Sequence, residues 1–239
     1  MHKILIIIPT YNEIENIESI IIAVLAISDN YHILIVDDNS PDGTADRVKS
    51  LMPQYGPRLD ILERKGKLGL GTAYIAGFRY ALERDYDYIM EMDADFSHNP
   101  DSIQSIYAAC QKEGVGMAVG SRYVKGGGFV NWSKYRLFLS YGASIYTRLI
   151  TGMTVKDATA GFVMYKREVL AKMDLNKIEF IGYAFQIEMK YYCHSIGYKI
   201  AEVPITFVDR ELGTSKMNSS IIKEAVLGVI KMRFRDYGS

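Results

Sequence analysis

The sequence predicts an α/β protein with a single, mainly parallel sheet that is flanked by helices. Two observations lead to this prediction. Short apolar runs rich in β-branched residues alternate with amphipathic segments through the first half of the chain, which is the pattern of parallel strands joined by crossover helices. The length of 239 residues suits one large α/β domain or two small ones, and no linker or internal repeat divides it. We therefore expect one domain over residues 1–239.

The first half of the chain supplies most of the expected sheet. Strands are expected at 3–8, 32–38, 58–63, 86–93 and 116–123. Helices are expected between and after them, at 13–27, 41–52, 71–84 and 97–111. The last of these helices has the clearest start: Asn99 can cap it, Pro100 fits its first position, and Asp101 favours the positive helix end.

The second half is less regular. A glycine-rich loop follows the strand at 116–123, and a helix that is partly apolar on all sides is expected at 135–153. A strand and then a helix are expected over 160–170, followed by a helix at 182–197 and a final amphipathic helix within 218–239. Residues 199–211 form either two strands or one bent strand, because Pro204 favours a sheet edge or a bulge.

Composition excludes several classes of protein. The formal net charge is zero, so we expect no nucleic-acid partner. The two cysteines, Cys110 and Cys193, lack metal-site spacing and are typical of core residues in a reducing compartment. The N-terminal apolar run is too short for a signal peptide, and no apolar window reaches the roughly 18 residues of a transmembrane helix. We expect a soluble, cytoplasmic chain.

Polar residues follow three of the expected strands, at 9–13 ("PTYNE"), 36–43 ("VDDNSPDG") and 93–98 ("DADFSH"). In open parallel sheets, ligands bind beyond the carboxyl ends of the strands, so these loops should share one rim. Within 36–43, Asp42 and Thr44 are expected to start a helix. Asp37 or Asp38 either serves the turn or accepts hydrogen bonds from the sugar or base of a nucleotide.

Asp93 and Asp95 are the strongest candidates for a metal site. Residues i and i+2 of a strand share a face about 6.6 Å apart, and a hard cation relieves the repulsion between two carboxylates. Oxygen ligands without a nearby cysteine favour Mg²⁺ or Mn²⁺ over Zn²⁺. The alternative is a helix cap plus a turn aspartate. His98 is expected to pack or cap rather than to bind.

A basic segment extends from Ser121 to Lys156. It holds six cations and no acidic residue, namely Arg122, Lys125, Lys134, Arg136, Arg148 and Lys156. Trp132 and several tyrosines lie among them, a composition suited to a membrane interface. The segment is either a solvated basic face or a phosphate site close to a lipid surface, since arginine binds phosphate oxygens in pairs.

Two further glycine-containing stretches carry weaker signals. Arg210 and Lys216 flank a Gly-Thr-Ser turn that either closes over a diphosphate or is an ordinary surface loop. Residues 69–72 ("GLGT") lack the third glycine of a dinucleotide fingerprint, and no phosphate-binding loop of the Walker type occurs. Dinucleotide-binding dehydrogenases and P-loop nucleoside triphosphatases are therefore disfavoured.

The motifs "PTYNE", "VDDNSPDGT", "GLGTAY", "DADFSHNP", "GSRY", "EVPITFVDR" and "SK" occur in this order. As a set they resemble those of the dolichyl-phosphate (polyprenyl-phosphate) mannose synthases, which are family 2 glycosyltransferases. The resemblance covers Lys3 to about Lys216. It implies a GT-A fold, a GDP-mannose donor, a divalent metal and a polyprenyl or dolichyl phosphate acceptor.

The resemblance also implies roles for individual residues. The residues expected to bind the donor are Pro9, Tyr11, Glu13, Val36, Asp38, Asp93, Ala94, Asp95, Arg210 and Lys216. Asp95 would be the main metal ligand, beside Asp93, and Ser97 stands where some relatives have a glutamine ligand. Arg122, Arg136 and Ser140 would receive the acceptor phosphate, and Asp95 and Arg122 would act in catalysis.

The chemistry of such an acceptor fits the basic segment. A phosphate monoester has a second pKa near ~6, so it is largely dianionic at neutral pH and needs no strong general base. We expect direct, inverting displacement at the sugar C1 by a peripheral enzyme at the cytosolic face of a membrane, with or without an anchoring partner subunit. The alternatives are a UDP-glucose or other nucleotide-sugar donor, and a binding module without turnover.

Overall fold

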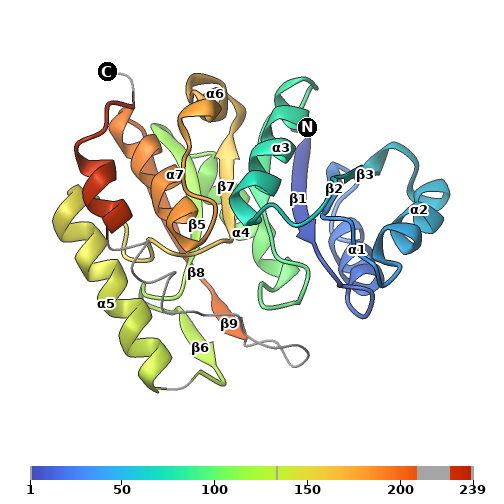
Figure 1. Ribbon diagram of the computed structural model, residues 1–239, viewed down its shortest axis with the longest axis horizontal. Helices are drawn as coiled ribbons and strands as arrows, with labels where there is room; N and C mark the ends of the chain where they lie inside the picture. The colour runs from blue at the N-terminus through green and yellow to red at the C-terminus, as the bar shows by residue number, and fades with distance from the viewer. Residues whose placement is uncertain (1, 133, 209–226, 238–239) are drawn as a thin grey trace.

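The structure is a computed structural model that describes residues 2–132, 134–208 and 227–237 (Figure 1). Within these residues, seven strands form one sheet in the spatial order β3 (Leu59–Glu63), β2 (Tyr31–Asp37), β1 (Ile4–Thr10), β4 (Tyr88–Glu91), β7 (Val163–Lys166), β5 (Val115–Ser121) and β8 (Lys199–Pro204). All neighbours are parallel except β7, which runs antiparallel to both β4 and β5. The predicted mainly parallel sheet is confirmed.

Helices cover both faces of this sheet. One face packs against α1 (Ile17–Leu25), α2 (Thr44–Tyr55) and α4 (Ile103–Cys110), and the other against α3 (Leu70–Leu82), α6 (Arg167–Lys172) and α7 (Tyr183–Ser195). Successive residues of β1 divide between the two cores: Leu5 and Ile7 join the α3 side, and Ile6 joins the α1 side. Because strand side chains alternate between faces, a strand buried on both sides is apolar throughout.

The remaining elements lie around this three-layered body. Short 3₁₀ helices are η1 (Gly56–Arg58), η2 (Pro100–Ser102) and η3 (Leu175–Lys177). A small parallel sheet pairs β6 (Gly128–Val130) with β9 (Thr206–Val208). The long helix α5 (Lys134–Thr151) and the helix at 227–233 lie next to α7 at one end of the molecule (Figure 1).

Local signals in the sequence agree with several of these boundaries. The Asn99 side chain accepts a hydrogen bond from the Asp101 backbone N–H at 3.0 Å, so the predicted cap is confirmed, and Pro100 opens η2, which leads into α4. Pro204 ends the edge strand β8, and the described residues 199–208 form two strands rather than one bent strand. The strand β6 was not predicted, because its residues were assigned to a glycine-rich loop. The first part of the expected C-terminal helix lies outside the described residues.

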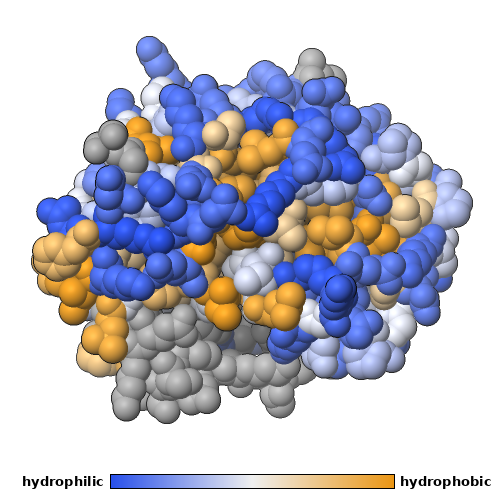
Figure 2. All heavy atoms as spheres, turned by 45° about the horizontal axis from the view of Figure 1, so that its top comes forward, coloured by the Kyte–Doolittle hydropathy of each residue, from blue (hydrophilic) through white to orange (hydrophobic). Residues whose placement is uncertain are grey.

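Apolar side chains are exposed along α5 and the helix at 227–233. Phe138 and Leu149 on α5 are 75% and 79% exposed, and Phe234 beside the second helix is 85% exposed. Figure 2 shows apolar side chains gathered at the edge of the molecule where α5 lies. Among the described residues, no helix combines the length and apolarity needed to cross a bilayer.

Candidate functional site

The ends of β1 and β2 are joined by a buried aspartate. The Asp37 carboxylate is fully buried and accepts hydrogen bonds from Thr10 Oγ1 at 2.8 Å, Ser40 N at 2.8 Å and Ser40 Oγ at 2.6 Å. Of the two alternatives for Asp37, the structure therefore supports the turn. The Asp42 carboxylate accepts hydrogen bonds from Thr44 N and Thr44 Oγ1, which confirms its predicted role at the start of α2.

Asp38 forms an ion pair that the sequence did not indicate. Both Nε and Nη2 of Arg64 lie 2.5 Å from Asp38 Oδ1, and Arg64 Nη1 also donates to Thr72 Oγ1 at 2.7 Å. This arginine therefore links the loop after β2 to the first turn of α3. The "GLGT" stretch serves this contact, since Thr72 is its last residue.

The other residues expected around a nucleobase surround the same two strand ends. Pro9 and Val36 are register partners on β1 and β2, and Val36 is fully buried. The backbone N–H of Glu13 donates to Thr44 Oγ1 at 3.0 Å, and the ammonium of Lys67 lies 4.5 Å from the centre of the Tyr11 ring. The first two polar loops are thus held together on one rim, as predicted.

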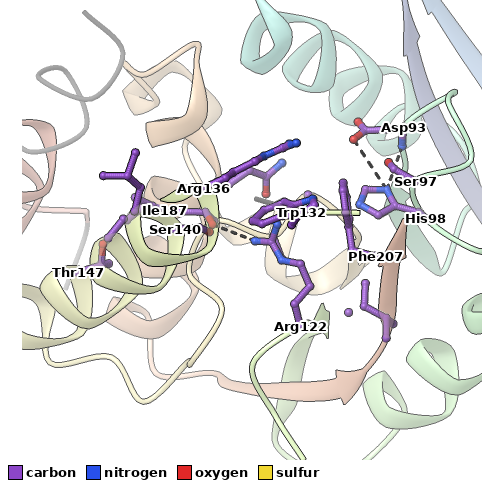
Figure 3. Close-up of a pocket in the computed structure, with 18 of the residues that line it drawn as sticks. Asp93, Ser97, His98, Arg122, Trp132, Arg136, Ser140, Thr147, Ile187 and Phe207 are labelled. Atoms are coloured by element: carbon purple, nitrogen blue, oxygen red, sulfur yellow. Dashed lines mark hydrogen bonds and ion pairs between the residues drawn. The ribbon is translucent and has the colours of Figure 1, made fainter. Parts of the chain in front are cut away.

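A cavity of about 430 Å³ lies beyond the carboxyl end of β4 (Figure 3). The loop after β4 contributes Asp93, Asp95 and Ser97, the end of β5 contributes Arg122, and the segment into α5 contributes Trp132, Arg136 and Ser140. The structure therefore brings the expected metal and acceptor residues into one cavity. Pro9, Tyr11, Glu13, Val36, Asp38 and Ala94 are not among its lining residues. Arg210 and Lys216 lie outside the described residues.

Both interpretations of the Asp93–Asp95 pair find support. Asp95 Oδ1 accepts the Ser97 backbone N–H at 3.1 Å, which is turn chemistry, yet Asp95 also lines the cavity. The Asp93 side chain is 39% exposed. Ser97 is buried, and its Oγ has no hydrogen-bond partner within the described part of the chain.

These residues fit a hard cation. Mg²⁺ is commonly held by one or two carboxylates together with substrate phosphates and water, and a partnerless hydroxyl beside two carboxylates matches that ligand set. The described residues contain no group of three His, Cys, Asp or Glu side chains arranged to hold a metal alone.

His98 packs against aromatic rings, as expected, and also lines the cavity. Its ring stacks on Phe162 with centroids 4.7 Å apart and meets the edge of Phe207 at 5.6 Å. Burial lowers the pKa of His98 to about 4, so the ring is neutral at neutral pH. Its Nδ1 accepts the Asp93 backbone N–H at 3.3 Å, which helps to fix the loop after β4.

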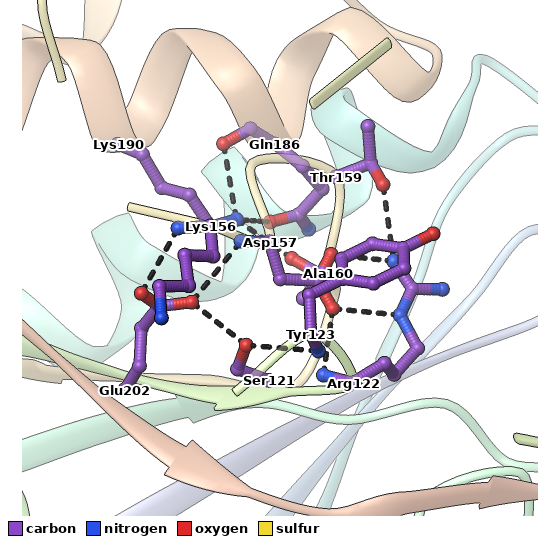
Figure 4. Close-up of polar contacts among 10 residues, drawn as sticks. All are labelled: Ser121, Arg122, Tyr123, Lys156, Asp157, Thr159, Ala160, Gln186, Lys190 and Glu202. Carbon is purple, nitrogen blue, oxygen red and sulfur yellow. Dashed lines mark hydrogen bonds and ion pairs between the residues drawn. The ribbon is translucent and has the colours of Figure 1, made fainter. Parts of the chain in front are cut away.

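Arg122 is held by an acidic residue immediately beyond the basic segment. Its Nε and Nη2 donate to the two carboxylate oxygens of Asp157 at 2.8 and 2.6 Å, its backbone N–H donates to the same carboxylate at 2.9 Å, and Nη2 also donates to Thr159 Oγ1 at 3.0 Å (Figure 4). Asp157 is fully buried. These hydrogen bonds make Arg122 a rigid, charge-compensated group. Asp157 lies one residue beyond the basic segment Ser121–Lys156, so the charge count over that segment did not include it.

Aromatic rings lie next to both arginines of the cavity. The Arg122 guanidinium carbon lies 5.3 to 5.7 Å from the ring centres of Tyr123, Phe129, Trp132 and Phe207. The Arg136 guanidinium carbon lies 4.1 Å from the centre of the Trp132 ring. These distances are in the cation–π range, which favours a fixed orientation of each guanidinium.

A buried polar network supports the floor of the cavity (Figure 4). Glu202 accepts hydrogen bonds from Ser121 Oγ at 2.7 Å and from the Lys156 and Asp157 backbone N–H groups at 2.9 and 3.0 Å. The Lys190 ammonium donates to the Ala160 carbonyl at 2.7 Å. The loop that carries Asp157 is thus fixed from two sides.

The network continues from Lys190 to β4. Lys190 also donates to Gln186 Oε1 at 3.3 Å, Gln186 donates to Glu91, and Tyr165 Oη donates to Glu91 at 2.6 Å. Burial raises the pKa of Glu91 to about 7 and lowers that of Lys190 to about 8. The sequence signal for this network is a glutamate inside an apolar strand and a lysine among the core positions of α7, and neither was predicted to have a partner.

Comparison with known proteins identifies the family. Residues 5–174 match the model of glycosyl transferase family 2. The chain belongs to this family. It is 44% identical over 233 residues to a polyprenol monophosphomannose synthase of Mycolicibacterium smegmatis, and the alignment covers 98% of this chain and 88% of that protein. It is 43% identical over 229 residues to an undecaprenyl-phosphate mannosyltransferase of Micrococcus luteus, which covers 96% and 93%.

Solved structures at low sequence identity have the same architecture. Glucosyl-3-phosphoglycerate synthase of Mycobacterium tuberculosis, determined with Mn²⁺, UDP-glucose and phosphoglyceric acid, aligns with a TM-score of 0.71 at 16% identity. The alignment covers 97% of this chain and 80% of that chain. The predicted GT-A fold is confirmed, as are the resemblance to polyprenyl-phosphate mannose synthases and the assignment as a glycosyltransferase.

Proposed function

We propose that this glycosyltransferase moves mannose from GDP-mannose to the phosphate of a polyprenyl or dolichyl phosphate, with inversion at the sugar C1. The observation that carries the proposal is that Asp93 and Asp95 line the same cavity as Arg122 and Arg136. A carboxylate pair suited to a cation and a guanidinium pair suited to an anion thus meet in one space. The names of the two relatives agree with a polyprenyl phosphate acceptor and a mannosyl group.

On the donor side, we assign the nucleotide to the rim formed by the first two polar loops. Tyr11, Glu13 and Asp38 lie there, and the Arg64–Asp38 pair fixes the loop after β2. Pro9, Val36 and Ala94 would complete the nucleotide site. Arg210 and Lys216 retain their proposed contact with the donor phosphates.

Mg²⁺ or Mn²⁺ would be held by Asp95, with Asp93 and Ser97 beside it. When bound, the cation supplies charge compensation for the departing nucleoside diphosphate. The chain itself contributes the two carboxylates and the rigid turn that the Ser97 backbone N–H makes to Asp95. That turn orients the carboxylate before any ligand enters.

On the acceptor side, Arg122, Arg136 and Ser140 would bind the lipid phosphate. Asp157 and Thr159 fix the Arg122 guanidinium by three side-chain hydrogen bonds, so little conformational entropy is lost on binding. Among the described residues lining the cavity, the carboxylates are Asp93 and Asp95, both on the proposed metal side. A dianionic phosphate needs no base to activate it, which suits this arrangement.

We place the enzyme peripherally at the cytosolic face of a membrane, with 121–156 and 218–239 facing the lipid and the whole of 1–239 acting as one catalytic domain. The exposed apolar residues of α5 and of the helix at 227–233 support this placement. An anchoring partner subunit is compatible with the same surface.

The test is transfer of radiolabelled mannose from GDP-mannose to a polyprenyl phosphate, with and without EDTA. We expect lipid-linked label that EDTA abolishes. A panel of UDP-glucose and other nucleotide sugars against the same lipid distinguishes a different donor. Tight binding of donor and lipid phosphate without turnover would identify a binding module and overturn the proposal.

A further inference from the structure

Trp132 occupies the wall of the cavity between the two arginines (Figure 3). Its ring lies 4.5 Å from the Phe129 centroid and meets Phe207 edge-on at 5.6 Å, while the Arg136 and Arg122 guanidinium carbons lie 4.1 and 5.3 Å from its centre. Contacts on several sides therefore fix the plane of the indole. A side chain held in this way presents its one polar atom in a constant direction.

That polar atom lacks a partner. The Nε1 of Trp132 is buried and has no hydrogen-bond partner within the described residues. An indole N–H can only donate, and a buried donor is normally paired. Since Trp132 lines the cavity, an acceptor atom of a bound ligand can complete the hydrogen bond.

The surroundings define the chemistry of that ligand atom. The two guanidinium groups next to the indole favour a negatively charged oxygen, and a phosphate offers several acceptor oxygens in different directions. Ser97 Oγ, which also lacks a partner within the described chain, belongs to the loop of the two aspartates. Tyr123 Oη and the cavity-lining Thr147 Oγ1 also lack partners within the described chain, but the Trp132 ring lies within 5.3 Å of both guanidinium carbons.

We infer that Trp132 is a fourth phosphate-binding residue, beside Arg122, Arg136 and Ser140: its N–H donates to an oxygen of the acceptor phosphate, and its face orients the Arg136 guanidinium. The identity of this phosphate as that of the lipid acceptor rests on the proposed function. The donor also carries phosphates, so the experiment must separate the two sources.

The kinetic test uses Trp132→Phe, which keeps an aromatic face for Arg136 and removes the N–H. Loss of one hydrogen bond to a charged group should raise the KM for polyprenyl phosphate by about tenfold or more. The KM for GDP-mannose and kcat should stay within about twofold, and unchanged thermal unfolding verifies the fold. Phe129→Leu is the matched control, because it alters the aromatic wall without removing a donor, and its acceptor KM should change less. An unchanged acceptor KM in Trp132→Phe, or an effect on the GDP-mannose KM instead, overturns the inference.

A binding test does not require turnover. Because Trp132 is the single tryptophan of the chain, the tryptophan fluorescence of the protein reports on this residue alone. Its fluorescence emission should change on titration with farnesyl phosphate and should not change with farnesol, which has the same chain and no phosphate. Equal responses to both overturn the inference. A phosphate-specific response in an enzyme that fails to transfer mannose refutes the proposed function and leaves Trp132 as a phosphate ligand. Mannose transfer that Trp132→Phe leaves unchanged supports the proposed function and overturns the inference about Trp132.

Discussion

Replacing Asp157 by asparagine should destabilise the protein by about 3–5 kcal/mol, because it leaves the Arg122 charge buried without its counter-charge. Asp157 is fully buried and Arg122 is 9% exposed, so water cannot replace the lost carboxylate. The asparagine amide would also direct N–H groups at one of the two sites where Arg122 now donates, at 2.6 to 2.9 Å. For a chain of this length the melting temperature falls about 2–4 °C per kcal/mol, so we expect a drop of about 6–20 °C.

Calorimetric or circular-dichroism melting of the wild type and the variant measures this effect. Asp46→Asn is the matched control, since the Asp46 side chain is 88% exposed, and its free energy of unfolding should change by less than about 0.5 kcal/mol. Arg122→Met combined with Asp157→Leu should recover part of the loss, because removing both charges leaves none unpaired. A loss below about 1 kcal/mol in Asp157→Asn, or a double variant as unstable as the sum of the singles, would refute the reasoning.

Three further outcomes are expected. Asp95→Asn should lower mannosyl transfer about 10²–10³-fold, whereas the exposed control Asp101→Asn should retain activity; equal activities of the two variants would contradict the site. Folded His98 has a pKa of about 4 and unfolded histidine about 6.5, so the unfolded chain binds more protons between these values. The contribution of His98 to the free energy of unfolding should therefore fall as pH decreases from 6.5 to 4, by up to ~1.4 kcal/mol per pH unit. The difference in this free energy between the wild type and His98→Gln, measured by urea unfolding, should shrink over the same range. A constant difference would contradict this expectation. Leu149→Asp should weaken sedimentation with anionic liposomes, while Ile22→Asp, an exposed apolar site on α1, should not; matching losses would exclude a specific face.

The first half of the fold could be predicted because its signals are local. A strand buried on both faces is continuously apolar, and the segments between the strands show helical spacing, so the strands β1 to β5 and the helices α1 to α4 appear in the sequence in order. The reversed direction of β7 could not be predicted. Pairing direction depends on how the chain returns across the sheet, and β7 carries no local mark of it. The three-residue strand β6 is too short for any period.

The candidate site also has a part that could be predicted and a part that could not. Asp93, Asp95, Arg122, Arg136 and Ser140 were expected together and line one cavity. Their partners were missed, because each partner lies far along the chain. Arg122 contacts Asp157 across 35 positions, and Gln186 contacts Glu91 across 95. Charge counting within a segment cannot detect such pairs. Single charged residues in apolar elements, such as Glu91 and Lys190, are the signal that a buried partner exists elsewhere.

The helix α5 presents two different stripes at a spacing of about four residues. Arg136, Ser140 and Thr147 face the cavity, while Tyr141, Ile145 and Leu149 face outward and are exposed. On a lipid surface these stripes would be mechanically coupled, since a rigid helix cannot rotate one without the other. Capture of the acceptor then becomes a two-dimensional search, in which the rate depends on the mole fraction of lipid phosphate in the bilayer rather than on its bulk concentration. The roll angle of one helix would set how far a phosphate head group must rise from the membrane to reach the arginines.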